Sequence, residues 1–278
     1  MTRDLTRVLT RAFALAALIL GAVLVLSPFL WMLALSLKAP DEIFTPNIDL
    51  IPNSLHWENY AAAFGRANLL RSLWNGAIVC SGILVLQTIF AVPCAFALAQ
   101  RRFAGRGVVF GLVLAGLLVP FHVTAIPIFL GLAQVRMLDS YTALIAPFAA
   151  SVFGIFLFRQ AFAALPTEVF EAARVDGLSE PAIVWRIAFP LALPAATAFA
   201  LFSIVAHWND LFWPLIATSN PALATPPRAI LYFRDAESGA EVGALMAAAV
   251  VVVAPMVALF LVAQRRFVQG LAAGGLKG

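Results

Sequence analysis

Long runs of apolar residues, interrupted by short polar segments, extend along the whole chain. A helix needs about 20 largely apolar residues to cross a bilayer, whereas the strands of a membrane barrel alternate apolar and polar positions. The unbroken runs therefore predict an all-α, polytopic membrane protein with six transmembrane helices in a single domain, residues 1–278. The predicted spans cover residues 12–35, 72–99, 108–133, 142–162, 190–217 and 242–263.

The composition excludes other classes of protein. Of the 278 residues, 63% are hydrophobic and 12% are charged, whereas soluble domains carry about 45–50% apolar and about 25% charged residues. Disordered chains are poor in apolar residues, so disorder is excluded as well. The net charge is +4, but the basic residues are scattered between apolar runs, which argues against nucleic acid as a partner. No cluster of histidine, cysteine and carboxylate residues suggests a metal site.

Basic residues distinguish the two sides of the predicted membrane domain. Cytoplasmic loops of membrane proteins carry the excess of lysine and arginine. The side that holds both termini carries twelve of the 18 basic residues, so both termini are predicted to be cytoplasmic. The opposite side holds two long segments that contain prolines, 38–71 and 218–241. Four tryptophans near the predicted outer ends of spans suggest an interfacial belt: Trp31, Trp57, Trp74 and Trp213.

The segment 164–189, between spans four and five, is longer and more acidic than the other loops predicted on the cytoplasmic side. Its acidic residues are Glu168, Glu171, Asp176 and Glu180. It reads as two short helices, because Gly177 suits a left-handed helix stop and Ser179 is a good N-cap. Ala172 and Ala173 leave a surface that another backbone can approach closely. The pattern predicts either a docking element or a solvated amphipathic loop.

Several polar side chains fall inside the predicted spans, among them Asn75, Gln87 and His207. Such residues usually face a bundle interior or a cavity, so they either form hydrogen bonds between helices or contact the hydroxyl groups of a transported solute. Aromatic faces combined with Asn, Asp and His hydrogen bonds suit sugars. The residues selected on this basis for a substrate path are His122, Trp208, Asn209 and Asp210.

One motif in the acidic segment resembles the signature loop of permeases from ATP-binding-cassette (ABC) importers. Glu171-Ala172-Ala173 is followed after three residues by Gly177, and after nine more by Ile187 and Pro190. The family has leucine where this chain has Phe189, an apolar replacement. Five positions at fixed spacing, between the predicted spans and on the predicted cytoplasmic side, make the match specific.

The resemblance covers nearly the whole chain and is to the carbohydrate-uptake branch, in particular the smaller six-span subunit similar to the maltose and glycerol-3-phosphate permeases. Few of the residues that carry it are diagnostic singly, but their order and spacing are. They are Phe29–Leu33, Ser36–Lys38, Glu58–Tyr60, Ala97-Leu98, Arg102-Phe103, Gly105-Arg106, Val123–Pro127, Phe153–Phe156, Arg159-Gln160, Trp208–Asp210, Trp213–Leu215, Phe267–Gly270 and Lys277-Gly278.

The resemblance implies a type I ABC importer permease fold and a role without chemistry of its own. It implies a second homologous permease subunit, two copies of an ATPase subunit that binds ATP, and an extracytoplasmic solute-binding protein, in a bacterial inner membrane. By resemblance, 164–189 is the coupling loop, with Glu171, Ala172, Ala173, Asp176 and Gly177 as the residues of ATPase coupling. This chain is expected to have no catalytic residues and to bind no cofactor or metal.

Two rival readings differ in testable ways. A membrane enzyme, such as an intramembrane protease or lipid transferase, needs a catalytic pair at membrane depth, and Asp210 is the one acidic residue well inside a predicted span. A self-sufficient channel or secondary transporter would leave the acidic loop 164–189 unexplained. No motif in the sequence identifies the transported solute. The sequence likewise has no motif that shows which permease subunit holds the binding site or what the C-terminal tail contacts.

Overall fold

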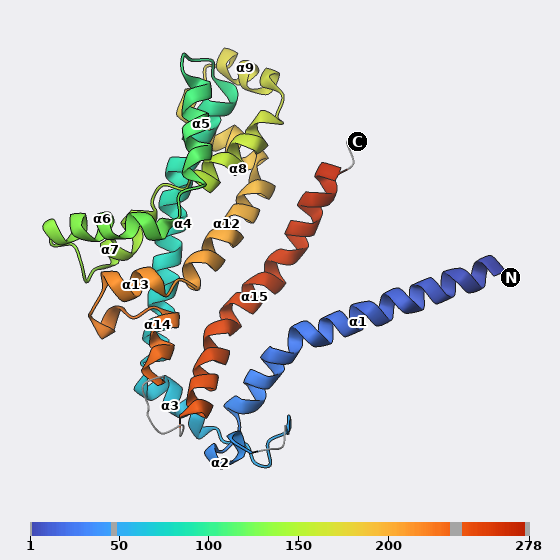
Figure 1. Cartoon of the computed structure of the whole chain (residues 1–278). Coiled ribbons are helices and arrows are strands. Elements are labelled where there is room, and N and C mark those ends of the chain that lie inside the picture. The colour runs from blue at the N-terminus through green and yellow to red at the C-terminus, as the bar shows by residue number, and fades with distance from the viewer. Residues whose placement is uncertain (1, 46–48, 234–240, 276–278) are drawn as a thin grey trace. The chain divides into compact units, whose positions relative to one another are not determined.

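The computed structural model describes residues 2–45, 49–233 and 241–275, with side chains described from 9 to 264 within these ranges. This part of the chain is helical (Figure 1). The elements are α1 (Thr2–Ser36), α2 (Pro40–Ile43), α3 (Glu58–Arg66), α4 (Leu69–Gln100), α5 (Arg106–Gly116), α6 (Phe121–Gln134), α7 (Tyr141–Ile145), η1 (Ala146–Phe148), α8 (Val152–Ala163), α9 (Thr167–Val175), α10 (Glu180–Ile183), η2 (Val184–Ala188, a π-helical turn), α11 (Phe189–Leu191), α12 (Leu193–Trp208), α13 (Phe212–Ala217), η3 (Pro221–Leu223), α14 (Pro226–Ile230), η4 (Leu231–Phe233) and α15 (Val242–Gly275).

Three of the predicted spans are single helices long and apolar enough to cross a membrane: Leu9–Ser36, Leu69–Gln100 and Val242–Gln264. The other three are helix pairs, bent by 95° between α5 and α6, by 45° between α7–η1 and α8, and by 82° between the helices before and after Ala192. Counted with each bent pair as one span, the described residues contain six. The expectation that 108–133, 142–162 and 190–217 are continuous helices is wrong.

Local backbone chemistry explains the bends. Pro120 lies between α5 and α6 with φ −65° and ψ 137°, which is extended backbone, and proline has no N–H to continue a helix. Ser151 is the N-cap of α8, where its hydroxyl accepts a hydrogen bond from the backbone N–H of Gly154 at 3.0 Å. Span five is interrupted twice, at Ala192 and again after Trp208, where α12 ends.

The described chain forms two compact units, of which the first combines residues up to 69 with 230–254. In this unit Asn59 of α3 donates from Nδ2 to the carbonyls of Ser36 at 3.1 Å and Lys38 at 3.0 Å. The hydroxyls of Tyr60 and Ser36 lie 2.8 Å apart. Carbonyls at a helix end lack intrahelical partners, so the Asn59-Tyr60 pair stabilises the end of α1. Gly243 allows the approach, because a Cβ there would lie 2.5 Å from Asn59 Nδ2.

The second unit comprises residues 70–229 and 255–278. Its largest apolar core joins α4, α8, α9 and α12 through buried aromatic and small side chains. At Gly154 the helices pack so closely that a Cβ would lie 2.8 Å from the ring of Phe199 and 3.3 Å from Ala91. A second core surrounds Trp213. The assignment of the whole chain to one permease domain stays a prediction.

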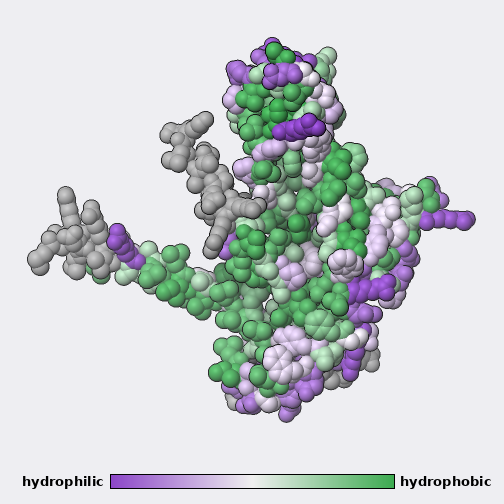
Figure 2. All heavy atoms as spheres, turned by 180° about the vertical axis from the view of Figure 1, so that it is seen from behind, coloured by the Kyte–Doolittle hydropathy of each residue, from purple (hydrophilic) through white to green (hydrophobic). Residues whose placement is uncertain are grey.

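Trp213 corrects one expectation about the interfacial belt. Its side chain is fully buried, and its indole N–H donates to the carbonyl of Ala143 at 2.8 Å. Trp57 and Trp74, by contrast, are exposed. Hydrophilic residues gather at the end of the second unit that carries α9, while hydrophobic residues cover much of the surface beyond it (Figure 2).

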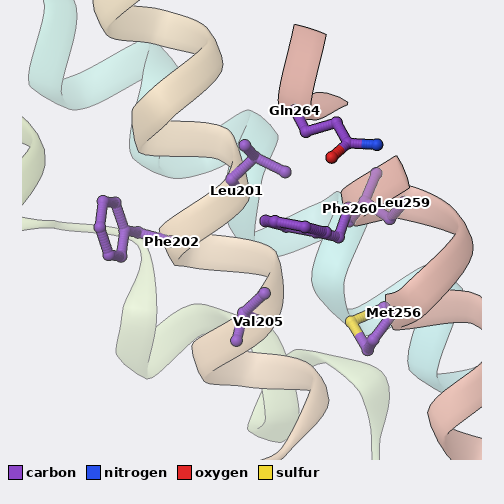
Figure 3. A pocket seen from close by; sticks show the side chains of 7 residues that line it. All are labelled: Leu201, Phe202, Val205, Met256, Leu259, Phe260 and Gln264. Atoms are coloured by element: carbon purple, nitrogen blue, oxygen red, sulfur yellow. The ribbon is translucent and has the colours of Figure 1, made fainter. Parts of the chain in front are cut away.

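An apolar groove of about 210 Å³ lies between α12 and the part of α15 that follows Pro255. In Figure 3 the side chains of Leu201 and Phe260 reach toward each other across it. Phe202 also lines this groove, although in Figure 3 its ring points away from α15. The two faces of α12 therefore contact different surroundings.

Candidate functional site

The acidic segment forms the two short helices that the sequence predicts. Helix α9 begins after Pro166, which occupies the N-cap with extended backbone, and α10 begins after Ser179. Ser179 lies at the predicted N-cap position, but its side chain makes no capping hydrogen bond. In Figure 1, α9 lies near the C-terminal end of α4. The segment is thus an ordered helical pair and not an extended loop.

Gly177 ends α9 in the left-handed conformation that the sequence predicts, with φ +82°. The N–H of Leu178 donates to the carbonyl of Ala173 at 3.1 Å, and the N–H of Gly177 donates to that of Arg174 at 3.0 Å. These two bonds form a Schellman motif, which satisfies carbonyls at the helix end. A residue with a Cβ is strained in this backbone conformation. Gly177 therefore fixes the direction in which the chain leaves α9.

Phe170 connects α9 to the long helices. The side chain is buried, and its ring packs edge-on against Phe96 of α4 with centroids 5.2 Å apart. Phe96 also contacts Phe162 of α8 at 5.8 Å. Aromatic pairs in this geometry contribute about 0.5–1.5 kcal/mol beyond the burial of their area. The cluster attaches one face of α9 firmly to α4 and α8.

An ion-pair network holds α9 against α10. The carboxylate of Glu180 accepts from Nε of Arg174 at 3.0 Å and also pairs with Arg101, which follows α4. Burial raises the pKa of Glu180, but the hydrogen bonds from Arg174 and Arg101 outweigh burial, so the pKa is lowered overall. The carboxylate is partly exposed, so we attribute orientation and little net stability to this network.

The residues expected to couple to an ATPase divide between two faces. Glu171, Ala172 and Asp176 are exposed on or beside α9. Ala173 is buried in the core of the chain itself. The expectation that both alanines form an open surface is therefore wrong for Ala173. Glu171 and Ala172 are exposed on one face of α9, and Phe170 packs the opposite face against α4 and α8.

The four substrate-path candidates do not form one cluster. Trp208 is buried at the end of α12, close to Gly76 of α4, where a Cβ would lie 3.1 Å from its ring. Asn209 is exposed and donates to the carbonyl of Val205 at 2.8 Å. Trp208 therefore serves packing, and the expectation that it lines a path is not supported by its burial.

His122 and Asp210 lie at helix ends. Asp210 accepts from the backbone N–H of Trp213 at 3.2 Å and so stabilises the first turn of α13. His122 is in the first turn of α6 and not mid-helix, with its exposed ring 4.4 Å from that of Phe212. The break between α12 and α13 brings these two candidates into one region.

Two polar clusters join residues that are far apart in sequence. Asn75 donates to the carbonyls of Ala222 and Ala224, each at 2.9 Å, and accepts from the hydroxyl of Tyr141 at 2.6 Å. It therefore makes the interhelical type of contact that the sequence left open.

Among the described residues, no group of three or more His, Cys, Asp or Glu side chains could hold a metal ion.

The second cluster contains Ser203, which sequence reasoning missed. Its hydroxyl donates to Gln87 Oε1 at 2.7 Å, and Gln87 Nε2 lies 3.3 Å from Nε2 of His207. Ser203 and His207 are four residues apart on α12 and so share a helix face. That spacing was the available signal, whereas the pairing with Gln87 on α4 needs the fold.

Residues 88–273 match the family described as "Binding-protein-dependent transport system inner membrane component". The chain belongs to this family. It is the multi-pass inner-membrane permease component of a binding-protein-dependent ABC transporter, and such components are not enzymes.

Relatives of the permease match along almost its whole length. The arabinooligosaccharide permease protein AraQ of Halalkalibacterium halodurans is 32% identical over 99% of this chain and 97% of its own. The diacetylchitobiose uptake permease NgcG of Streptomyces coelicolor is 32% identical over 95% and 88%. The sn-glycerol-3-phosphate permease UgpE of Yersinia enterocolitica is 32% identical over 93% and 95%. The predicted likeness to carbohydrate-uptake permeases is confirmed.

A solved structure has the same fold as the permease. A chain from a bacterial ABC transporter involved in the import of alginate, an acidic polysaccharide, matches with a TM-score of 0.81 over 92% of this chain and 97% of its own, at 24% identity. A second matches with a TM-score of 0.60 at 16% identity, from a complex with a pentasaccharide-bound periplasmic protein. The prediction of an all-helical importer permease with about six spans is confirmed.

Outside the spans, Asp139 orders a loop of the permease. Its Oδ1 accepts from the backbone N–H groups of Asn220 at 2.8 Å and Ser219 at 2.5 Å. These two donors hold the pKa of Asp139 below its ordinary value, and Arg228 adds to the effect. A lowered pKa keeps the carboxylate ionised at neutral pH, so this contact is lost only when the pH falls through the lowered value.

Proposed function

We propose that this permease forms, with a second homologous permease, the translocation path of an importer for a sugar or related polar solute. The observation that carries the proposal is near-full-length identity of 32% to permeases whose names specify arabinooligosaccharides and diacetylchitobiose. Polar side chains on α4 and α12 support it, because they need a facing partner or a water-filled path and not lipid.

The segment 164–189 is the coupling loop of the proposed importer, and two ATPase copies bind ATP and dock, one on each permease. Glu171, Ala172 and Asp176 are exposed for this contact, and Gly177 fixes the end of the docking helix. The Phe170 cluster supports the proposal, because a firmly attached helix can transmit ATPase closure to α4 and α8. Closure then biases the equilibrium between inward-facing and outward-facing states.

The docking role is tested by purifying the whole importer in mild detergent. Glu171→Lys reverses a charge on the exposed face of α9, so we expect the second permease to co-purify while the ATPase is lost. Glu168→Lys makes the same reversal at an exposed position of α9 outside the signature, and should retain more of the ATPase. We also expect the intact complex to take up arabinotriose or diacetylchitobiose when ATP is supplied. This uptake should be absent when the ATPase is left out. Uptake by the permease alone would overturn the proposal.

Both termini lie in the cytoplasm in the proposed arrangement, and segments 38–71 and 218–241 face the solute-binding protein. The support is the charge bias of the loops. Residues 46–48 and 234–240, including Ser238, lie outside the described residues.

Labelling tests this orientation at Ser219, which is exposed. In a background where Cys80 and Cys94 are replaced by serine, Ser219→Cys should react with a membrane-impermeant maleimide in intact spheroplasts. A cysteine at Glu168, exposed on α9 outside the signature, should react only after lysis. The reverse pattern would show that the termini lie outside.

A further inference from the structure

A hollow of about 430 Å³ opens between α4, α8 and α12 of the second unit. Its lining consists of Gln87, Ser151, Phe153, Phe199, Phe202, Ser203, Ala206 and His207. An adjoining hollow of about 350 Å³ shares Gln87, Ser151 and Phe153 with it and continues toward α5 and α6. The two together are large enough for sugar rings, since ligand pockets commonly measure about 300–1,000 Å³.

The polar groups of the hollow are held in place by one another. Ser203 donates to Gln87, and the Gln87 amide lies beside His207, as described above. Gln87 and Ser203 are buried. A primary amide carries two N–H donors, and a hydroxyl accepts as well as donates. The cluster therefore retains hydrogen-bonding capacity for a ligand after its internal bonds are made.

Aromatic rings stand beside these groups. Phe153 and Phe202 pack edge to face with centroids 5.7 Å apart, and both rings are partly exposed. Phe202 projects away from α15, as Figure 3 shows. The C–H face of a sugar ring packs on an aromatic ring while its hydroxyls bond to amide, hydroxyl and imidazole groups. A mostly apolar lining with a few placed polar groups is typical of small-molecule sites.

Within the part of the chain that the structure describes, the lining also contains no lysine, arginine, aspartate or glutamate. A phosphate or carboxylate that left water for such a surface would lose its hydration without a charged partner. The hollow is equally poorly suited to contact with lipid chains, because amide and imidazole groups rarely face hydrocarbon. A neutral, hydroxyl-rich solute satisfies both the polar cluster and the rings.

We propose that the Gln87–Ser203–His207 cluster, with Phe153 and Phe202, binds neutral sugar units during translocation, so that this subunit contributes directly to solute selection. The inference rests on the proposed import function and deepens it. It separates this permease from those that carry sn-glycerol-3-phosphate or an acidic polysaccharide, for which a charged lining is expected.

The test uses the complete importer in proteoliposomes, with arabinotriose, diacetylchitobiose and sn-glycerol-3-phosphate as probes. The wild type should take up a neutral sugar in preference to the phosphate. Phe202→Ala and Ser203→Ala should each lower that uptake at least tenfold at low sugar concentration. Receptor-stimulated ATP hydrolysis should stay within about twofold of wild type, because neither change touches the ATPase contact.

Matched controls lie on α4 beside the cluster but outside the lining. Thr88 bonds to the carbonyl of Leu84, and Phe90 is exposed, so Thr88→Ala and Phe90→Ala should leave uptake unchanged. Wild-type uptake by Phe202→Ala and Ser203→Ala would overturn the inference while leaving the import function intact. Loss of the second permease from these variants would identify the hollow as a subunit interface and overturn it too. Absence of ATP-dependent uptake by the wild type would overturn the import function itself.

Discussion

Phe170→Ala is expected to loosen α9 and abolish receptor-stimulated ATP hydrolysis, while ATPase activity without receptor persists. Truncation of a buried phenylalanine typically costs about 3–5 kcal/mol, through lost burial and the cavity left behind. Here the lost contacts are those with Phe96 and the core around Phe162. Because they attach the proposed docking helix to α4 and α8, their loss should interrupt the transmission of ATPase closure.

Hydrogen exchange and ATP hydrolysis measure this result in the reconstituted importer. Amides of residues 167–178 should exchange faster in Phe170→Ala, and stimulation by the loaded binding protein should disappear. Val169→Ala changes the adjacent, exposed residue of α9 and should leave both measurements close to wild type. Phe170→Leu, which keeps most of the buried volume, should restore partial stimulation. Full stimulation in Phe170→Ala would contradict the role assigned to this contact.

Gly177→Val is expected to separate accumulation of the protein from its coupling. A β-branched residue at φ +82° costs about 1–2 kcal/mol, the penalty of left-handed backbone for residues with a Cβ. That cost is small beside the energy that holds the spans in a bilayer, so the permease should reach normal membrane levels. It is large enough to disrupt the Schellman bonds that direct the chain from α9 into α10, and the docking helix should be misplaced.

Immunoblots of membranes and co-purification of the ATPase distinguish these two effects. We expect normal abundance, with the ATPase lost or its stimulation reduced at least tenfold. Gly177→Asn is the matched control, because asparagine tolerates left-handed backbone better than valine does, and it should retain substantial coupling. Transport at the wild-type rate by Gly177→Val, with the ATPase still bound, would show that the conformation at Gly177 is not needed for docking.

Local signals account for what was predicted correctly in the coupling segment. The stop of α9 depends on one residue without a Cβ, so the role of Gly177 can be predicted without knowledge of the fold. The start of α10 after Ser179 was also predicted, but the capping hydrogen bond expected from its side chain is not made. The burial of Ala173 and the exposure of Ala172 depend on which face of α9 meets Phe96 and Phe162. That choice is made by helices that are distant in sequence.

The bends and the tryptophans show the same limit inside the membrane. Both a lipid-facing and a core-facing position of a span favour apolar residues, so hydropathy does not separate them. Trp213 was therefore placed at the interface when it lies in a core, and the sequence did not show that Trp208 is buried beside Gly76. The bend of 95° beside Pro120 was not predicted from the sequence, because its angle depends on the packing of α5 and α6.

The sequence by itself determined that the protein is helical and membrane-spanning, approximately where its six spans lie, and its membership of the importer permeases. Those features follow from run lengths, charge bias and spaced motifs, which are properties of the chain alone. Only the tertiary structure decided that Ser203 meets Gln87 across 116 residues, that Phe170 anchors α9, and where the polar hollow opens. Each of these depends on side chains from different helices meeting in space, and their spacing along the chain does not encode that meeting.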